Sequence, residues 1–145
     1  MALARMITGN RVSQLIYVAA KLGIADMLKE GPKSCEEMAM VAGVHSRSLY
    51  RVMRALASIG IFTEREDGRF DLTPLAACLQ TGVANSRRFT AITFGEEYHH
   101  ILGSLLSSVK TGEVAFDQIY GTGYFHYLEQ NPEAAATFNE FMTET

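Results

Sequence analysis

The architecture of this chain follows from residues 46–74, which read SRSLYRVMRALASIGIFTEREDGRFDLTP. The first half of this stretch predicts a helix from His45 to about Ile59, because its apolar and basic side chains separate onto opposite faces at about 100° per residue. The apolar face holds Leu49, Val52, Met53 and Leu56, and the basic face holds Arg47, Arg51 and Arg54. The second half predicts a β-hairpin, since two short strands at 61–64 and 69–72 flank a turn with Asp67-Gly68. Thr73-Pro74 then predicts a new helix, with Thr as the cap and Pro at the first position.

Two further helices are expected before this stretch. Ser34 and Glu37 have the spacing of a capping box, which predicts a short helix through Val41. A longer helix is expected from Arg5 to Leu22, where Val12, Leu15, Ile16 and Ala19 follow the i, i+3, i+4, i+7 spacing. Residues 15–20 are apolar nearly all round, which is typical of a helix lying between two bodies. In so small a chain we expect the second body to be another subunit, a plain core helix being the alternative.

The sequence therefore predicts a mainly α fold. The order helix, helix, helix, hairpin is that of a winged helix, and we assign this core to about residues 24–80 of a single domain, 1–145. A helical extension is expected at about 85–145. Helices are predicted there at 87–94 and 97–110, followed by short turns at 116–120 and 124–129. A last helix is predicted to be capped by Asn131 and to start at Pro132.

Length and composition narrow the class of protein. The 145 residues accommodate one domain, not two catalytic domains. The net charge is −3, so the chain lacks the excess of lysine and arginine that favours binding to phosphate groups. With two cysteines, Cys35 and Cys78, the chain cannot be a disulfide framework, and a reducing, cytoplasmic location is the simpler interpretation. The most apolar stretch is far shorter than a membrane span, so we expect no membrane segment.

No residue pattern predicts a catalytic, cofactor-binding or metal-binding site. His99 and His100 are adjacent in sequence, so on a helix their rings point about 100° apart and do not face one ion. The motif Gly121-Thr122-Gly123 has no strand before it and no third glycine after it, so it does not predict a nucleotide-binding loop.

The basic helix face leaves a DNA-binding regulator as an alternative function. In a helix-turn-helix, side chains such as Arg47, Arg51 and Arg54 would enter the major groove while the wing contacts the backbone. The predicted wing, however, carries three acidic residues beside Arg65 and Arg69, where phosphates would lie. A solvated or interdomain face is therefore favoured, and a nucleic-acid partner is disfavoured.

Several longer motifs are similar to those of a known enzyme family. They are SQLIYVAAKLGIAD at 13–26, SLYRVMRALASIGIF at 48–62, GRF at 68–70, LTPL at 72–75, KTGE at 110–113, NPEAA at 131–135 and FN at 138–139 with Met142. Together they closely resemble the N-terminal region of bacterial S-adenosylmethionine-dependent small-molecule O-methyltransferases, relatives of the caffeate and hydroxyneurosporene enzymes. The resemblance covers essentially the whole chain.

This resemblance implies a helical, winged-helix-like domain that forms an intertwined homodimer through its N-terminal helices. It places Val12, Leu15, Ile16 and Ala19 at the dimer interface. It also implies that a Rossmann-like domain, which binds S-adenosylmethionine and carries the catalytic base, lies outside this sequence. The chain alone would then bind no methyl donor and transfer no methyl group.

The family's connecting helix turns apolar side chains toward the acceptor, a small aromatic or polyketide-type hydroxyl compound. On the matched motif these side chains are Phe138 and Met142, with plain interdomain packing as the alternative. The segment near Asn10 is expected to approach the pocket of the other subunit. The absence of tryptophan departs from many relatives and puts the acceptor's identity in doubt. A stand-alone descendant that binds a small molecule is a further alternative.

Overall fold

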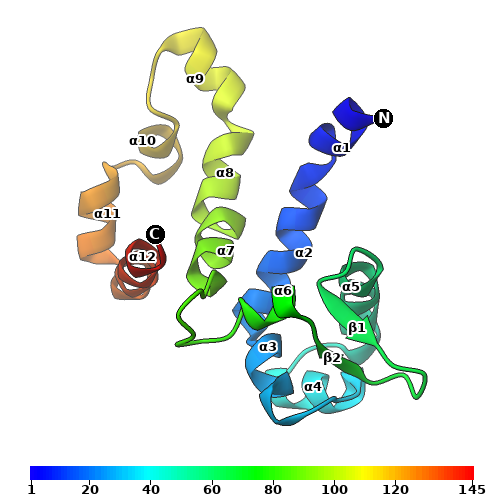
Figure 1. Ribbon diagram of the computed structural model, residues 1–145. Helices are drawn as coiled ribbons and strands as arrows, with labels where there is room; N and C mark the ends of the chain where they lie inside the picture. Colours follow the sequence, from blue (N-terminus) through cyan, green and yellow to red (C-terminus); the bar gives the residue numbers. More distant parts are fainter.

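The N-terminal half of the chain is a set of short helices in the computed structural model, which describes residues 1–145. These helices lead into the predicted hairpin (Figure 1). Their bounds are α1 Ala2–Ile7, α2 Gly9–Leu22, α3 Ile24–Met27, the 3-10 turn η1 Leu28–Glu30, α4 Cys35–Ala42 and α5 Ser46–Ser58. The capping box predicted for α4 is confirmed, since Ser34 and Glu37 exchange both hydrogen bonds.

The hairpin consists of β1 Phe62–Glu64 and β2 Phe70–Leu72, which pair antiparallel with Phe62 opposite Leu72. Lys33 bridges to Phe70 and ties the segment before α4 to this hairpin. The short helix α6, Pro74–Ala77, starts at the predicted Thr73 cap, where the side-chain oxygen accepts from the Ala76 amide.

The C-terminal half is entirely helical. Its helices are α7 Arg88–Gly95, α8 Glu97–Gly103, α9 Leu105–Thr111, α10 Ala115–Tyr120, α11 Tyr124–Gln130 and α12 Pro132–Glu144. In Figure 1, α7, α8 and α9 form one column beside α2, and α10 to α12 lie on the far side of that column. The hairpin, α4 and α5 lie at the opposite end of α2 from α1. No helix combines the length and the apolar character needed to cross a membrane.

One hydrophobic core joins the hairpin, α3 to α5, and the buried ends of α2 and α7. It contains 16 buried residues, all between Ala19 and Ile92 in sequence. The largest fully buried side chains are Phe62, Phe70, Ile24, Leu28, Met38, Met53 and Leu56. The division of the chain into a part at 24–80 and a part at 85–145 stays a prediction. The hydrophobic core extends beyond residues 24–80 at both ends, from Ala19 to Ile92.

Three local predictions were wrong. The helix expected from Arg5 is two helices separated at Thr8, whose hydroxyl donates to the Ala4 carbonyl. The helix expected over 97–110 is interrupted at Ser104. Asn131 does not cap α12, because its side-chain amide donates instead to the Tyr127 carbonyl of the preceding helix.

Contacts within one chain largely explain why residues 15–20 of α2 are apolar nearly all round. Residues 15–20 are buried or half-buried because α2 lies between α5 on one side and α7 on the other. The approach to α7 is close: a Cβ added at Gly95 would lie 2.2 Å from Tyr17 Cγ. The interpretation of residues 15–20 as a two-sided helix is therefore correct, but α7 supplies the second body along most of it.

Candidate functional site

A cavity of about 670 Å³ lies between α2, the α7–α8 junction and α10 to α12. This volume falls in the range of small-molecule pockets. Its wall is formed by Tyr17, Lys21, Thr93, Glu96, Glu97, His100, Tyr120, Tyr124, Tyr127, Gln130, Asn131, Pro132, Glu133, Ala134, Thr137 and Phe138. The cavity thus draws on segments from both ends of the chain.

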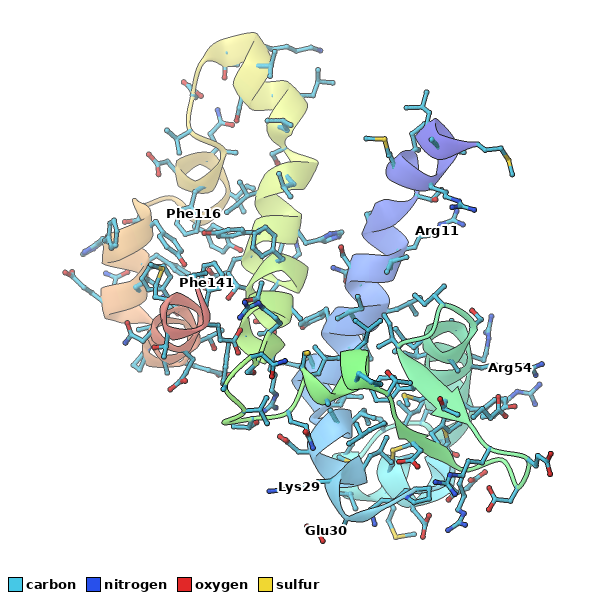
Figure 2. The ribbon with its side chains drawn as sticks, in the orientation of Figure 1. Arg11, Lys29, Glu30, Arg54, Phe116 and Phe141 are labelled. Carbon is cyan, nitrogen blue, oxygen red and sulfur yellow. The ribbon has the colours of Figure 1, made fainter.

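Aromatic side chains form much of this wall. Tyr120 and Tyr127 pack with ring centroids 4.8 Å apart, and Phe138 meets Tyr124 edge-on at 5.4 Å. Phe116 lies behind them, stacked on Tyr120 at 4.4 Å. Figure 2 shows Phe116 and Phe141 extending into the space between the α7–α8 column and α10 to α12. Such rings present flat apolar faces with hydroxyl groups at their edges.

Charged groups also line the cavity. Lys21 forms an ion pair with Glu96 at 2.7 Å, and the Tyr17 hydroxyl donates to the same carboxylate at 2.8 Å. Burial together with this bond to Glu96 raises the pKa of Tyr17 to about 12. Burial likewise raises the pKa of the Glu97 carboxyl; the Tyr124 hydroxyl opposes this effect, and the neighbouring Glu96 adds to it. Glu97 takes part in none of the ion pairs.

The two predicted acceptor-contacting residues lie in different surroundings. Phe138 lines the cavity and is half-buried, whereas Met142 is 54% exposed and outside the cavity wall. Tyr124 also lines a smaller apolar cavity of about 340 Å³, formed with Phe94, Tyr98, Ile101, Leu102 and Phe116. Sequence reasoning missed the tyrosines and Glu97. The three-residue spacing of Tyr124 and Tyr127 within α11 was a signal for two of the tyrosines, whereas Tyr120 belongs to the preceding helix α10.

Two rows of apolar side chains are exposed outside the cavity. One lies on α1 and the start of α2: Leu3, Met6, Ile7 and Val12. The other lies on α8, α9 and the segment after them: Leu102, Leu105, Leu106, Val109 and Val114. We call them the α1 row and the α9 row. Exposed apolar surface of this extent marks an interaction site.

The predicted interface residues divide between surface and core. Val12 belongs to the α1 row, and Leu15 and Ile16 are half-buried against the core. Ala19 is only 1% exposed and belongs to the core of its own chain. It is therefore not free to contact a partner subunit.

The arginine face of α5 is solvent-exposed at all three positions, and Arg54 points away from the molecule in Figure 2. The two arginines of the hairpin are neutralised locally, since Arg65 pairs with Asp71 at 2.5 Å and Arg69 with Asp67 at 2.8 Å. The hairpin thus offers no free cation to a phosphate backbone. This arrangement does not support the DNA-binding alternative.

Neither a metal site nor a nucleotide-binding loop is formed by the residues that the sequence offered for them. No three metal-ligating side chains come together. Gly121 and Gly123 lie in the turn between α10 and α11, and no strand leads into that turn. The residues present therefore do not fit the glycine-rich site of a methyl donor.

Comparison with known proteins identifies relatives that share this architecture. The family model of the O-methyltransferase dimerisation domain matches residues 4–82. Phenazine O-methyltransferase PhzM of Lysobacter antibioticus is 51% identical over 138 residues, which are 95% of this chain and 40% of that enzyme. The crystal structure of LaPhzM matches with a TM-score of 0.95 at 49% identity, over 99% of this chain and 43% of that chain.

A more distant structure carries ligands. The O-methyltransferase NcsB1 from neocarzinostatin biosynthesis, in complex with S-adenosylmethionine and 2-hydroxy-5-methyl naphthoic acid, matches with a TM-score of 0.81 at 29% identity. That match covers 92% of this chain and 42% of that chain. The chain spans about 40% of the length of the curated relatives it matches.

Proposed function

The chain belongs to the O-methyltransferase dimerisation domain family, and from this premise we propose that it holds two methyltransferase subunits together and supplies one wall of their acceptor pocket. Self-association is the general role of this family. The parts proposed here are the surfaces that carry it and the cavity that receives the acceptor.

The two exposed apolar rows support the dimer. Helix α1 exposes apolar side chains on consecutive turns: Leu3 is 68% exposed, Met6 77% and Ile7 69%. Leu106 and Val109 on α9 are 66% and 75% exposed. In a two-fold dimer, the α1 row of each subunit packs on the α9 row of the other, so one contact is made twice. Val12 extends the α1 row, and Leu15 and Ile16 form its half-buried edge.

Light scattering after size-exclusion chromatography tests this arrangement. We expect the chain to be a dimer at micromolar concentration, and Ile7→Glu or Leu106→Glu to make it a monomer because each buries a charge in the interface. Met40→Glu is the matched control, since Met40 is 84% exposed on α4, outside both rows. A monomeric parent chain contradicts the proposed dimer, and a dimer in both row variants contradicts the assigned surfaces.

The cavity supports the acceptor role. It is lined by Phe138, one of the two residues that the family motif assigns to the acceptor, and its tyrosines offer further aromatic surface. Relatives of this chain are named for phenazine and naphthoate substrates. We therefore assign the cavity to a planar aromatic acceptor. Met142 reaches the acceptor only if the pocket extends beyond the cavity wall.

S-adenosylmethionine is assigned to the part of the full-length enzyme that this chain does not span. Catalysis and donor binding by the 145 residues are accordingly not expected. Calorimetry with S-adenosylmethionine checks this directly, because a measurable heat of specific binding to this chain would contradict the assignment.

A further inference from the structure

Glu97 is the one carboxylate of the cavity wall that forms no ion pair. Glu96, the residue before it, already binds Lys21 and the Tyr17 hydroxyl. Glu133 is at the rim, 92% exposed and 3.9 Å from Lys21. The single lysine of the wall is therefore already engaged with Glu96, 2.7 Å away.

The environment of Glu97 makes an unpaired carboxylate costly. The side chain is half-buried, and burial raises the pKa of its carboxyl group. The Tyr124 hydroxyl lies beside this carboxyl group and lowers its pKa as a hydrogen-bond donor would, but the contact lacks normal hydrogen-bond geometry. A partly buried charge without a full set of partners destabilises a fold, so the folding of the chain does not account for it.

Two hydroxyl groups of the cavity wall lack hydrogen-bond partners. The Thr93 hydroxyl oxygen and the Tyr124 hydroxyl oxygen are both buried without a hydrogen bond, and both residues line the cavity. Thr93 as a whole is only 4% exposed. Thr93 belongs to α7, Glu97 to the start of α8 and Tyr124 to α11, so two unsatisfied hydroxyl groups and a half-buried carboxylate line the same cavity. Buried polar groups nearly always have partners, so such a group calls for an explanation.

We propose that Glu97, with Thr93 and Tyr124 beside it, is the specificity determinant of the cavity and accepts a hydrogen bond from an N–H or O–H donor on the edge of a bound aromatic ring. This inference rests on the proposed acceptor role of the cavity. The ring lies among Tyr120, Tyr127 and Phe138, and its donor edge faces Glu97. A site built around an acceptor of this kind rejects an isostere that lacks the donor, because the carboxylate is then left buried and unpaired.

Indole and benzofuran test the proposal, since they share size and shape but only indole carries a ring-edge N–H. Their binding to the 145-residue chain is measured by chemical-shift titration. We expect indole to bind about tenfold more tightly than benzofuran, the range for a hydrogen bond to a charged group. Glu97→Met keeps the side-chain volume and removes the acceptor. It should abolish the preference, because benzofuran then no longer leaves a carboxylate buried and unpaired.

Glu140→Met is the matched control, because Glu140 lies on the exposed side of α12 outside the cavity wall. It should keep the preference for indole. Thermal unfolding should show that Glu97→Met is at least as stable as the parent, since an unpaired carboxylate has been removed.

The possible failures are distinguishable. Equal binding of the two compounds to the parent chain, or a preference that survives Glu97→Met, overturns the role of Glu97 and leaves the acceptor cavity standing. Binding of neither compound overturns the acceptor cavity itself, and with it this inference. The dimer proposal is independent of all three results.

Discussion

The core around the hairpin and the helical segment that follows Gly95, which we call the extension, are stabilised in different ways. The 16-residue buried cluster lies wholly between Ala19 and Ile92, whereas beyond Gly95 the chain buries only Ala115, Phe116, Leu128 and Phe141 among its apolar residues. The extension instead exposes the α9 row and surrounds a cavity with tyrosines. The core is thus complete within one chain, while the extension leaves much of its apolar surface uncovered.

A matched pair of phenylalanines tests this contrast most strongly. Phe70 is fully buried in the core and Phe125 is 72% exposed on α11. Phe70→Ala should lower the free energy of unfolding by about 3–5 kcal/mol, because it removes a large side chain and leaves a cavity. Phe125→Ala should change it by less than about 0.5 kcal/mol. Urea unfolding followed by circular dichroism measures both, and similar losses for the two variants would contradict the contrast.

The contact between Gly95 of α7 and Tyr17 of α2 should give the next largest change in the free energy of unfolding. A methyl group at Gly95 would collide with the Tyr17 ring, and that ring is held by its hydrogen bond to Glu96. Gly95→Ala should therefore cost about 1–3 kcal/mol, the usual penalty for overpacking. Gly103→Ala is the control, since a Cβ at Gly103 meets nothing within 4 Å. An equal response of the two glycines would show that α2 and α7 do not approach as closely as described.

The core was the part that the sequence predicted well. The order of its longer helices, the hairpin at Asp67-Gly68, and the caps at Ser34 and Thr73 were identified, because local turn and cap chemistry determines them. The short α3 and η1 were not predicted. The resemblance to O-methyltransferases and the mainly α fold are likewise confirmed. These features depend on residues close together in the sequence.

The extension and the cavity were predicted less completely, since they depend on contacts between distant segments. Asn131 was assigned as a cap from its position before Pro132, but the preceding helix α11 offers its carbonyl to the same side chain. Ala19 was assigned to a subunit interface because the periodicity of α2 does not reveal which body covers it. Glu97 stands at the start of the helix predicted over 97–110, and the sequence does not indicate that Tyr124, 27 residues further along the chain, lies beside it.

Glu144 connects the end of the extension to the start of α7 and gives a pH-dependent test. Its carboxylate accepts hydrogen bonds from the Phe89 and Thr90 amides and from the Ser86 and Thr90 hydroxyls. Burial alone would raise its pKa, but these four bonds outweigh burial and hold the pKa below its ordinary value of 4.5. The carboxylate thus acts as a cap for α7 supplied from α12.

Glu144→Gln should lower the free energy of unfolding by about 1–2 kcal/mol at neutral pH, as for the loss of a helix cap. A lowered folded-state pKa means that this stabilisation is present above the unfolded-state pKa and is lost as the pH falls through the folded-state value. The difference between parent and variant should therefore shrink below about pH 4.5. Unfolding curves at pH 7 and at acidic pH measure it, with Glu140→Gln as control. A difference that stays constant with pH would exclude the carboxylate as the cause.

The first residues of α4 and α12 give the smallest expected difference in stability, since one helix is capped by a side chain and the other is not. Ser34 caps α4 with a reciprocal pair of hydrogen bonds, whereas Asn131 precedes α12 without capping it. Ser34→Ala should cost about 1 kcal/mol, because it leaves the Glu37 amide at the first turn without its acceptor. Asn131→Ala removes a single bond to the Tyr127 carbonyl and should cost about 0.5 kcal/mol, the lower limit for one hydrogen bond. Urea unfolding of the two variants separates these values. If Asn131→Ala were the costlier change, Asn131 would be capping α12 in solution, and the extension would be fixed by local sequence as firmly as the core.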